Sequence, residues 1–192
     1  MALRVPDVSA DHVEAVRSHL SDLAGAPVGG ALEPMKPTAV ALAVPHHVYS
    51  LGLDDLARGA RLDEATPGTL RFLVMEGDAA IASAELGAEG GFQSNEGPFV
   101  AATVAAIRDA ENIAEVADGS YELRALRIPA LYLMALWLKD DRGEADIVIP
   151  MAPAPAPLEA ERRYPPEELI PQLAEMAERM LGSMERPDEE GG

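Results

Sequence analysis

The sequence of 192 residues contains no cysteine. This absence excludes disulfide cross-links, thiolate zinc sites, iron–sulfur clusters and cysteine nucleophiles. Apolar residues make up 48% of the chain, which at this length is enough to bury a core without cross-links or metals. We therefore predict one folded domain over residues 1–186, followed by a disordered tail at 187–192.

Long apolar runs are also missing. The longest, residues 128–138, is interrupted by Pro129 and falls well short of the roughly 20 residues that a membrane helix needs. No apolar segment follows Arg4 in the way that a secretory signal requires. These two observations predict a cytoplasmic protein that does not bind or cross a membrane.

Lysine is scarce: only two of the 15 basic residues, Lys36 and Lys139, are lysines. The acidic residues number 33. The formal net charge of −18 opposes binding to nucleic acids and to anionic lipids. A surface made for a basic partner, or one that mimics a polyanion, is an alternative interpretation. The preference for arginine over lysine is typical of a GC-rich genome or a salt-adapted proteome, so we interpret the acidity mainly as a source of solubility.

Two segments before the proline-rich region have helical periodicity. In residues 9–25 apolar side chains recur three or four positions apart, with Ser9 as a candidate N-cap and Gly25 as a stop. A second helix is predicted to begin at Gly97-Pro98 and to end or bend near Asn112.

The remaining body has the patterns of strands. Gly77-Asp78 predicts a type II′ turn between strands at 70–76 and 79–86, and residues 38–44 and 47–53 are predicted to form two short extended pieces. Residues 121–125 alternate as a half-buried strand, and residues 130–138 and 146–150 are predicted to pair as a hairpin, although composition alone would also allow a helix at 130–138. The predicted fold is α+β, a mostly antiparallel sheet built from hairpins with three helices packed on one face.

A proline-rich strap separates the body, residues 1–150, from a C-terminal helix. Alternating prolines in the first half of the strap, residues 150–165, favour an extended connector. Helical spacing then returns at residues 166–184, where one apolar face is formed by Leu169, Leu173, Met176 and Met180. The sequence leaves open whether this face docks on its own body or on another chain, and we predict that it binds a partner.

Recognisable catalytic motifs are absent as well. No G-x-S-x-G elbow, phosphate-binding lysine loop or dinucleotide fingerprint occurs. The glycine-rich loop at 87–97 runs into a predicted helix N-terminus, which can bind anions, but Glu89 and Glu96 would repel them and a mobile surface loop is favoured. The acidic turn at 140–146 lacks the pattern of a calcium loop, so a solvated hairpin tip is favoured there.

The adjacent histidines His46 and His47, with Asp54 and Asp55 nearby in sequence, are the candidate metal ligands. One objection is that neighbouring residues on a strand point to opposite faces, so both histidines could reach one metal only through an irregular backbone. No organic cofactor is indicated. The alternative to a metal site is a purely structural role, in a turn or edge strand with one histidine packed and the other exposed.

The sequence therefore favours a non-enzymatic protein-binding or regulatory module, whose partner is another protein or a second copy of the chain. Two alternatives stay open: a small metal-dependent hydrolase that uses His46 and His47, and a small-molecule-binding domain with a pocket between the sheet and the helices.

Overall fold

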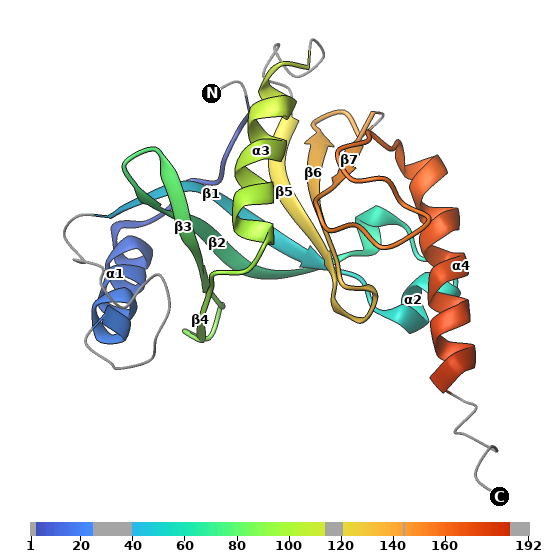
Figure 1. Cartoon of the computed structure of the whole chain (residues 1–192), viewed down its shortest axis with the longest axis horizontal. Coiled ribbons are helices and arrows are strands. Elements are labelled where there is room, and N and C mark those ends of the chain that lie inside the picture. The colour runs from blue at the N-terminus through green and yellow to red at the C-terminus, as the bar shows by residue number, and fades with distance from the viewer. Residues whose placement is uncertain (1–2, 25–39, 114–120, 144, 185–192) are drawn as a thin grey trace, which may run out of the picture.

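A seven-stranded mixed sheet, with the order β4-β3-β2-β1-β5-β6-β7, forms the centre of the molecule in the computed structural model (Figure 1). The structure describes residues 3–24, 40–113, 121–143 and 145–184, and all statements below concern these residues. Five neighbouring strand pairs are antiparallel, and β1 pairs with β5 in parallel. The strands are β1 (Ala41–Ser50), β2 (Thr66–Glu76), β3 (Ala79–Leu86), β4 (Phe92–Asn95), β5 (Tyr121–Ile128), β6 (Leu133–Asp140) and β7 (Ile147–Pro150).

Four α-helices accompany the sheet: α1 (Ala10–Ala24), α2 (Leu53–Ala57), α3 (Phe99–Glu111) and α4 (Pro166–Met184). Short 3-10 turns lie at Leu62–Glu64 and Pro129–Leu131. The α+β class and the mostly antiparallel sheet are confirmed. None of the helices in the described ranges is long and apolar enough to cross a membrane. The predicted tail at 187–192 lies outside these ranges.

Hairpin chemistry explains how the first part of the sheet forms. Gly77, at φ +58, turns β2 into β3 as the glycine-first pair predicts, because glycine enters the left-handed region without steric cost. β1 is one strand rather than the two pieces predicted at 38–44 and 47–53. The strand contains an irregularity between Ala43 and His46. There Val44 has φ +48, and Pro45 has no N–H to donate to the ladder.

The second part of the sheet is the meander β5-β6-β7. From Leu133 on, the apolar run at 130–138 is a strand and not a helix, because β6 is the central strand of this meander and is buried on both faces, whereas the start of the run belongs to a 3-10 turn. Pro129 ends β5 and opens the 3-10 turn that leads into β6.

The helices are divided between the two faces of the sheet, contrary to the expected single face. In β2, Phe72 and Val74 belong to the core beneath α1, whereas Leu73 between them belongs to the core beneath α3. The same alternation in β6 sends Leu136 toward α3 and Trp137 toward α2 and α4. Strands buried on both faces require cover on both sides, and the apolar content of β2 and β6 was the signal for this.

Helix α4 packs on the body of its own chain. Leu169 and Leu173 are fully buried in a core shared with Leu56 of α2 and Trp137 of β6. The connector before α4 is not extended throughout, because it turns at 156–157 and 160–161 and is held to β7 by reciprocal backbone hydrogen bonds between Tyr164 and Val148. This anchoring places α4 against α2 at one side of the molecule (Figure 1).

Candidate functional site

A fully buried arginine, Arg71, lies on the α3 face of strand β2. Its neighbours Leu70 and Phe72 point to the opposite face, toward α1, as the alternation of a strand requires. The strand register places Arg71 between His46 of β1 and Glu85 of β3. Only 1% of Arg71 is exposed, although arginine is among the residues that are least often buried.

The guanidinium of Arg71 lacks the hydrogen bonds that a buried arginine needs. Its Nε atom lies 3.8 Å from Glu85 Oε1, beyond hydrogen-bond length, and neither Nε nor Nη1 has a partner among the described residues. Glu85 is engaged elsewhere, because it accepts hydrogen bonds from Thr69 Oγ1 at 2.7 Å and from Arg127 Nη2. Two arginines and one glutamate therefore meet in this cluster, which carries one net positive charge.

Burial and these contacts shift the pKa values of the charged groups. Burial is the largest influence on Arg71 and lowers its pKa, while the charge of Glu85 opposes this change. For Glu85 burial acts to raise the pKa, but the hydrogen bond and charge of Arg127, with smaller contributions from Thr69 and Arg71, outweigh it and lower the pKa. Glu85 is therefore ionised at neutral pH.

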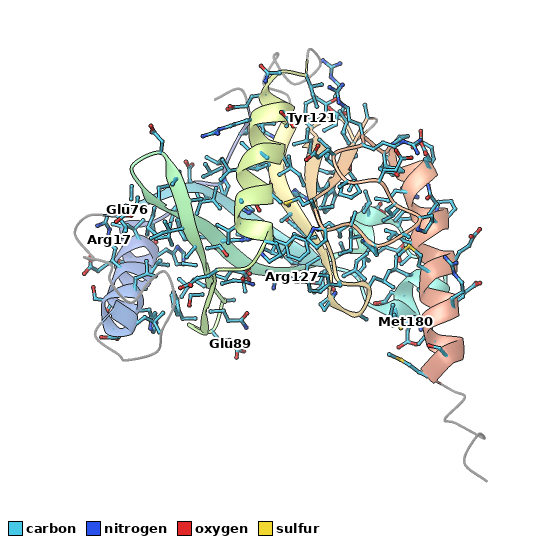
Figure 2. All side chains as sticks on the ribbon, viewed as in Figure 1. Arg17, Glu76, Glu89, Tyr121, Arg127 and Met180 are labelled. Atoms are coloured by element: carbon cyan, nitrogen blue, oxygen red, sulfur yellow. The ribbon has the colours of Figure 1, made fainter. Side chains whose placement is uncertain are left out.

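A cavity of about 300 Å³ opens beside this cluster, at the N-terminal end of α3. In Figure 2, Arg127 lies close to this end of the helix. One part of the wall is polar and includes Arg71, Glu85 and Arg127 with residues 93–95 of β4. The other part is apolar and includes Phe99, Pro129 and residues 132–134. The helix terminus adds partial positive charge, so the cavity favours a small anion.

The loop at 87–97, which the sequence favours as a mobile surface loop, contains strand β4 and supplies part of this wall. Asn95 Oδ1 accepts a hydrogen bond from the Gly97 N–H at 2.6 Å and so fixes the entry into α3. The sequence did not favour an anion site at a helix N-terminus for this loop, but the position of the loop is consistent with one.

His46 extends the polar row beyond Arg71. It is fully buried, and its Nδ1 lies 2.8 Å from the Val44 carbonyl, so Nδ1 carries the proton and donates. Nε2 has no partner among the described residues. Burial is the main reason that the pKa of His46 falls to about 4, and the nearby charge of Arg71 lowers it further, whereas the Val44 hydrogen bond acts to raise it. His46 is therefore neutral at physiological pH.

The four candidate metal ligands do not come together. His47 points to the face opposite His46, with Arg124 as its cross-strand neighbour. Asp54 and Asp55 are exposed on α2, and Asp55 forms an ion pair with Arg58 at 2.6 Å. Within the described parts of the chain no group of three histidine or carboxylate side chains could hold a metal ion. The arrangement does not support the metal-dependent hydrolase.

The predicted partner-binding residues are part of the intramolecular core. Leu169, Leu173 and Met176 are buried against the body, and Met180 is half-buried beside them. A partner could reach Leu169 and Leu173 only if α4 left the body, whereas Met180 is partly accessible where it lies. Binding of a protein or of a second copy stays a prediction, and light scattering of the full chain would test the second copy.

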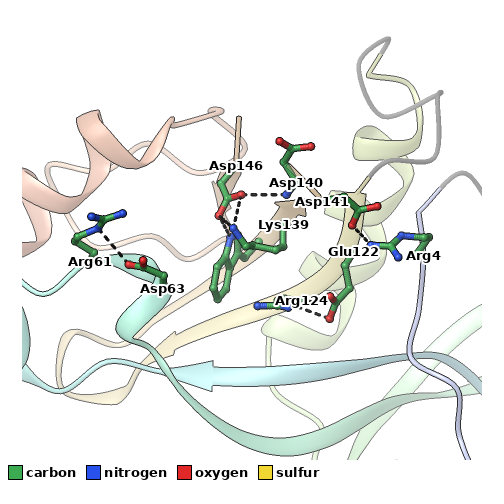
Figure 3. A network of polar contacts seen from close by, with 10 residues as sticks. Arg4, Arg61, Asp63, Glu122, Arg124, Lys139, Asp140, Asp141 and Asp146 are labelled. Atoms are coloured by element: carbon green, nitrogen blue, oxygen red, sulfur yellow. Dashed lines mark hydrogen bonds and ion pairs between the residues drawn. The ribbon is translucent and has the colours of Figure 1, made fainter. Parts of the chain in front are cut away.

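A second buried charged cluster surrounds Asp146, which lies between β6 and β7 (Figure 3). Asp146 accepts hydrogen bonds from Trp137 Nε1 at 2.9 Å, from the Asp140 N–H at 3.0 Å and from Lys139 Nζ at 3.1 Å. Residues 141–143 and 145 are exposed, as predicted for a solvated tip, whereas Asp140 and Asp146 on either side of them are buried. The burial of Asp146 was not predicted, because Trp137, a buried donor, requires an acceptor that only the fold brings near.

Sequence reasoning did not identify Arg71, Glu85 or Arg127. The sequence did contain a signal. Arg71 is a charged residue within an apolar part of β2, and Glu85 is a charged residue within an apolar part of β3. A charged residue inside a strand that is buried on both faces demands a partner or a ligand. No family model matches this sequence, and the comparisons with curated proteins and with solved structures give no significant match.

Proposed function

We propose that this chain is a ligand-binding module and that the cavity beside the N-terminus of α3 takes a small anion. The observation that carries the proposal is Arg71, which is 1% exposed and has two nitrogen atoms without a hydrogen-bond partner among the described residues. Burying a charged group without compensation costs several kcal/mol, so native proteins pair such groups or use them. A carboxylate or phosphate oxygen in the cavity would supply the missing acceptor.

Charge and size agree with this proposal. The charged side chains of the cavity wall, Arg71, Arg127 and Glu85, sum to one positive charge, and about 300 Å³ is at the lower end of the range for small-molecule pockets. The chain as a whole carries −18 and repels anions at long range. The attraction must therefore come from the short-range field of the two arginines, strengthened by their burial.

Thermal unfolding with acetate, phosphate and benzoate, each against chloride at equal ionic strength, tests the proposal. A ligand that binds only the folded chain raises the melting temperature. We expect at least one of these anions to do so, and we expect the Arg71→Met variant to lose the effect, because methionine retains much of the side-chain volume but neither the charge nor the donors.

Arg124→Met is the matched control. Arg124 lies on the opposite face, where its guanidinium stacks 4.6 Å from the Tyr49 ring centroid and forms two hydrogen bonds to Glu122. This variant removes a half-buried arginine and should retain the full anion effect. If none of the three anions raises the melting temperature of the unmodified chain, or if Arg71→Met retains the increase, the proposal is wrong.

A further inference from the structure

Tyr132 stands at the mouth of the cavity in an unusual conformation. It is 60% exposed and has φ +51 and ψ +37, a left-handed conformation that a bulky side chain rarely adopts. The conformation is fixed locally, because the Tyr132 N–H donates to the Pro129 carbonyl at 2.9 Å and closes the turn before β6. Strained residues that persist in a fold cluster at ligand sites, and this one directs an aromatic ring to a pocket wall.

The ring of Tyr132 has an aromatic neighbour in the wall of the cavity. Phe99, the first residue of α3, lies with its ring centroid 5.3 Å from that of Tyr132, at an interplanar angle of 49°. Both rings line the cavity, together with Pro129, Leu133 and Met134. A ligand bound to the arginines would extend its non-ionic part along this wall, where a flat ring gains more contact than a flexible or rounded group.

The charges of the site distinguish between kinds of anion. One positive charge in excess is neutralised by a carboxylate, whereas a phosphate dianion would place an uncompensated negative charge near Glu85. Glu85 is held ionised by its contacts with Arg127 and Thr69, so it cannot relieve that repulsion by taking a proton at neutral pH.

We propose that the ligand of this cavity is a flat aromatic monocarboxylate, with its carboxylate on Arg71 and its ring beside Tyr132 and Phe99. This inference rests on the proposed anion-binding function and adds the class of ligand to it. Arg71 and Arg127, which both line the cavity, account for the carboxylate, and the aromatic pair Tyr132 and Phe99 accounts for the ring.

Isothermal titration calorimetry with four probes tests the ligand class. Benzoate carries both features, cyclohexanecarboxylate lacks the flat ring, benzamide lacks the charge, and inorganic phosphate lacks the ring and carries more charge. We expect benzoate to bind about threefold to tenfold more tightly than cyclohexanecarboxylate, the range expected for an aromatic contact. Phosphate should bind at least about tenfold more weakly than benzoate, and benzamide should show no heat of binding.

Two variants locate the ring. Tyr132→Leu should weaken benzoate about threefold to tenfold and leave cyclohexanecarboxylate nearly unchanged, and Phe99→Leu should act in the same direction. Met184→Leu, at a large exposed apolar residue on α4, should change neither affinity. Because Tyr132 is exposed, its replacement tests binding without opening the core.

The outcomes separate this inference from the function on which it rests. Equal affinity for benzoate and cyclohexanecarboxylate, or an unchanged affinity of Tyr132→Leu for benzoate, would overturn the aromatic class but leave an anion site. Tighter binding of phosphate would overturn the monocarboxylate and likewise leave the anion site. If neither benzoate, cyclohexanecarboxylate nor phosphate binds, the ligand class fails, and the proposed function fails with it if acetate also leaves the melting temperature unchanged.

Discussion

The clusters around Asp146 and Arg71 bury charge in opposite ways. Asp146 is 8% exposed and receives hydrogen bonds from an indole, an ammonium group and a backbone N–H, so its acceptor capacity is well used. Arg71 is 1% exposed and faces a carboxylate that other donors already occupy. Buried polar networks stabilise a fold when they are complete and destabilise it when they are not.

We interpret this difference as one between a structural role and the proposed binding role. In the Asp146 cluster every contact ties β6 to the turn that leads into β7, so the cluster is accounted for by the fold that it supports. The Arg71 cluster is incomplete, and the same face of the sheet also carries the unpartnered atoms His46 Nε2 and Ser83 Oγ. Sites that bind ligands commonly retain such unsatisfied groups at the expense of stability.

The largest effect is expected from breaking the complete cluster. Asp146→Ala removes the acceptor of Trp137 and Lys139 and leaves both donors unpaired at a largely buried position. We expect the free energy of unfolding, measured by urea titration, to fall by about 3 kcal/mol. Asp141→Ala is the control, because Asp141 is exposed and forms an ion pair with the exposed Arg4, so its loss should change stability by less than about 1 kcal/mol. A similar small change for both variants would mean that the Asp146 cluster is not structural.

The next effect concerns pH and comes from the incomplete cluster. His46 has a pKa of about 4 in the folded chain, mainly because it is buried, whereas an unfolded histidine has a pKa of about 6.5. Below about pH 6.5 the histidine is protonated in the unfolded chain but stays neutral in the folded chain. The free energy of unfolding therefore falls as the pH drops toward about 4. The loss amounts to something on the order of 3 kcal/mol at most and should be spread across this interval.

His46→Asn isolates this contribution, because the asparagine amide can donate to the Val44 carbonyl without titrating. The difference between the unfolding free energies of the unmodified chain and the variant should shrink or change sign between about pH 6.5 and pH 4. His47→Asn leaves His46 in place, so the fall in stability toward pH 4 that His46 produces should remain. A constant difference between the unmodified chain and His46→Asn would show that His46 takes up its proton in the folded state.

The accuracy of the sequence predictions followed how local their physics was. The turn at Gly77-Asp78 and the bounds of α1 depend on neighbouring residues, and both were predicted. The division of the helices between two faces was not, because it depends on which core each side of β2 and β6 joins. The sequence alone shows that Arg71 is a charged residue within an apolar part of its strand. Its unpartnered state depends on Thr69 and Arg127 occupying Glu85, which no local pattern shows.

The smallest effect distinguishes a partnered from an unpartnered hydroxyl on the α3 face. Ser83 is fully buried on β3 and its Oγ has no partner among the described residues, whereas Thr69 of β2 donates to Glu85 at 2.7 Å. Ser83→Ala should leave the free energy of unfolding unchanged or raise it by up to about 1 kcal/mol, and Thr69→Val should lower it by about 1–2 kcal/mol. If Ser83→Ala instead costs as much as Thr69→Val, the Ser83 hydroxyl is hydrogen-bonded in solution. Water that reaches Ser83 could then reach Arg71 on the same face, and the contrast between the two clusters would be one of hydration rather than of function.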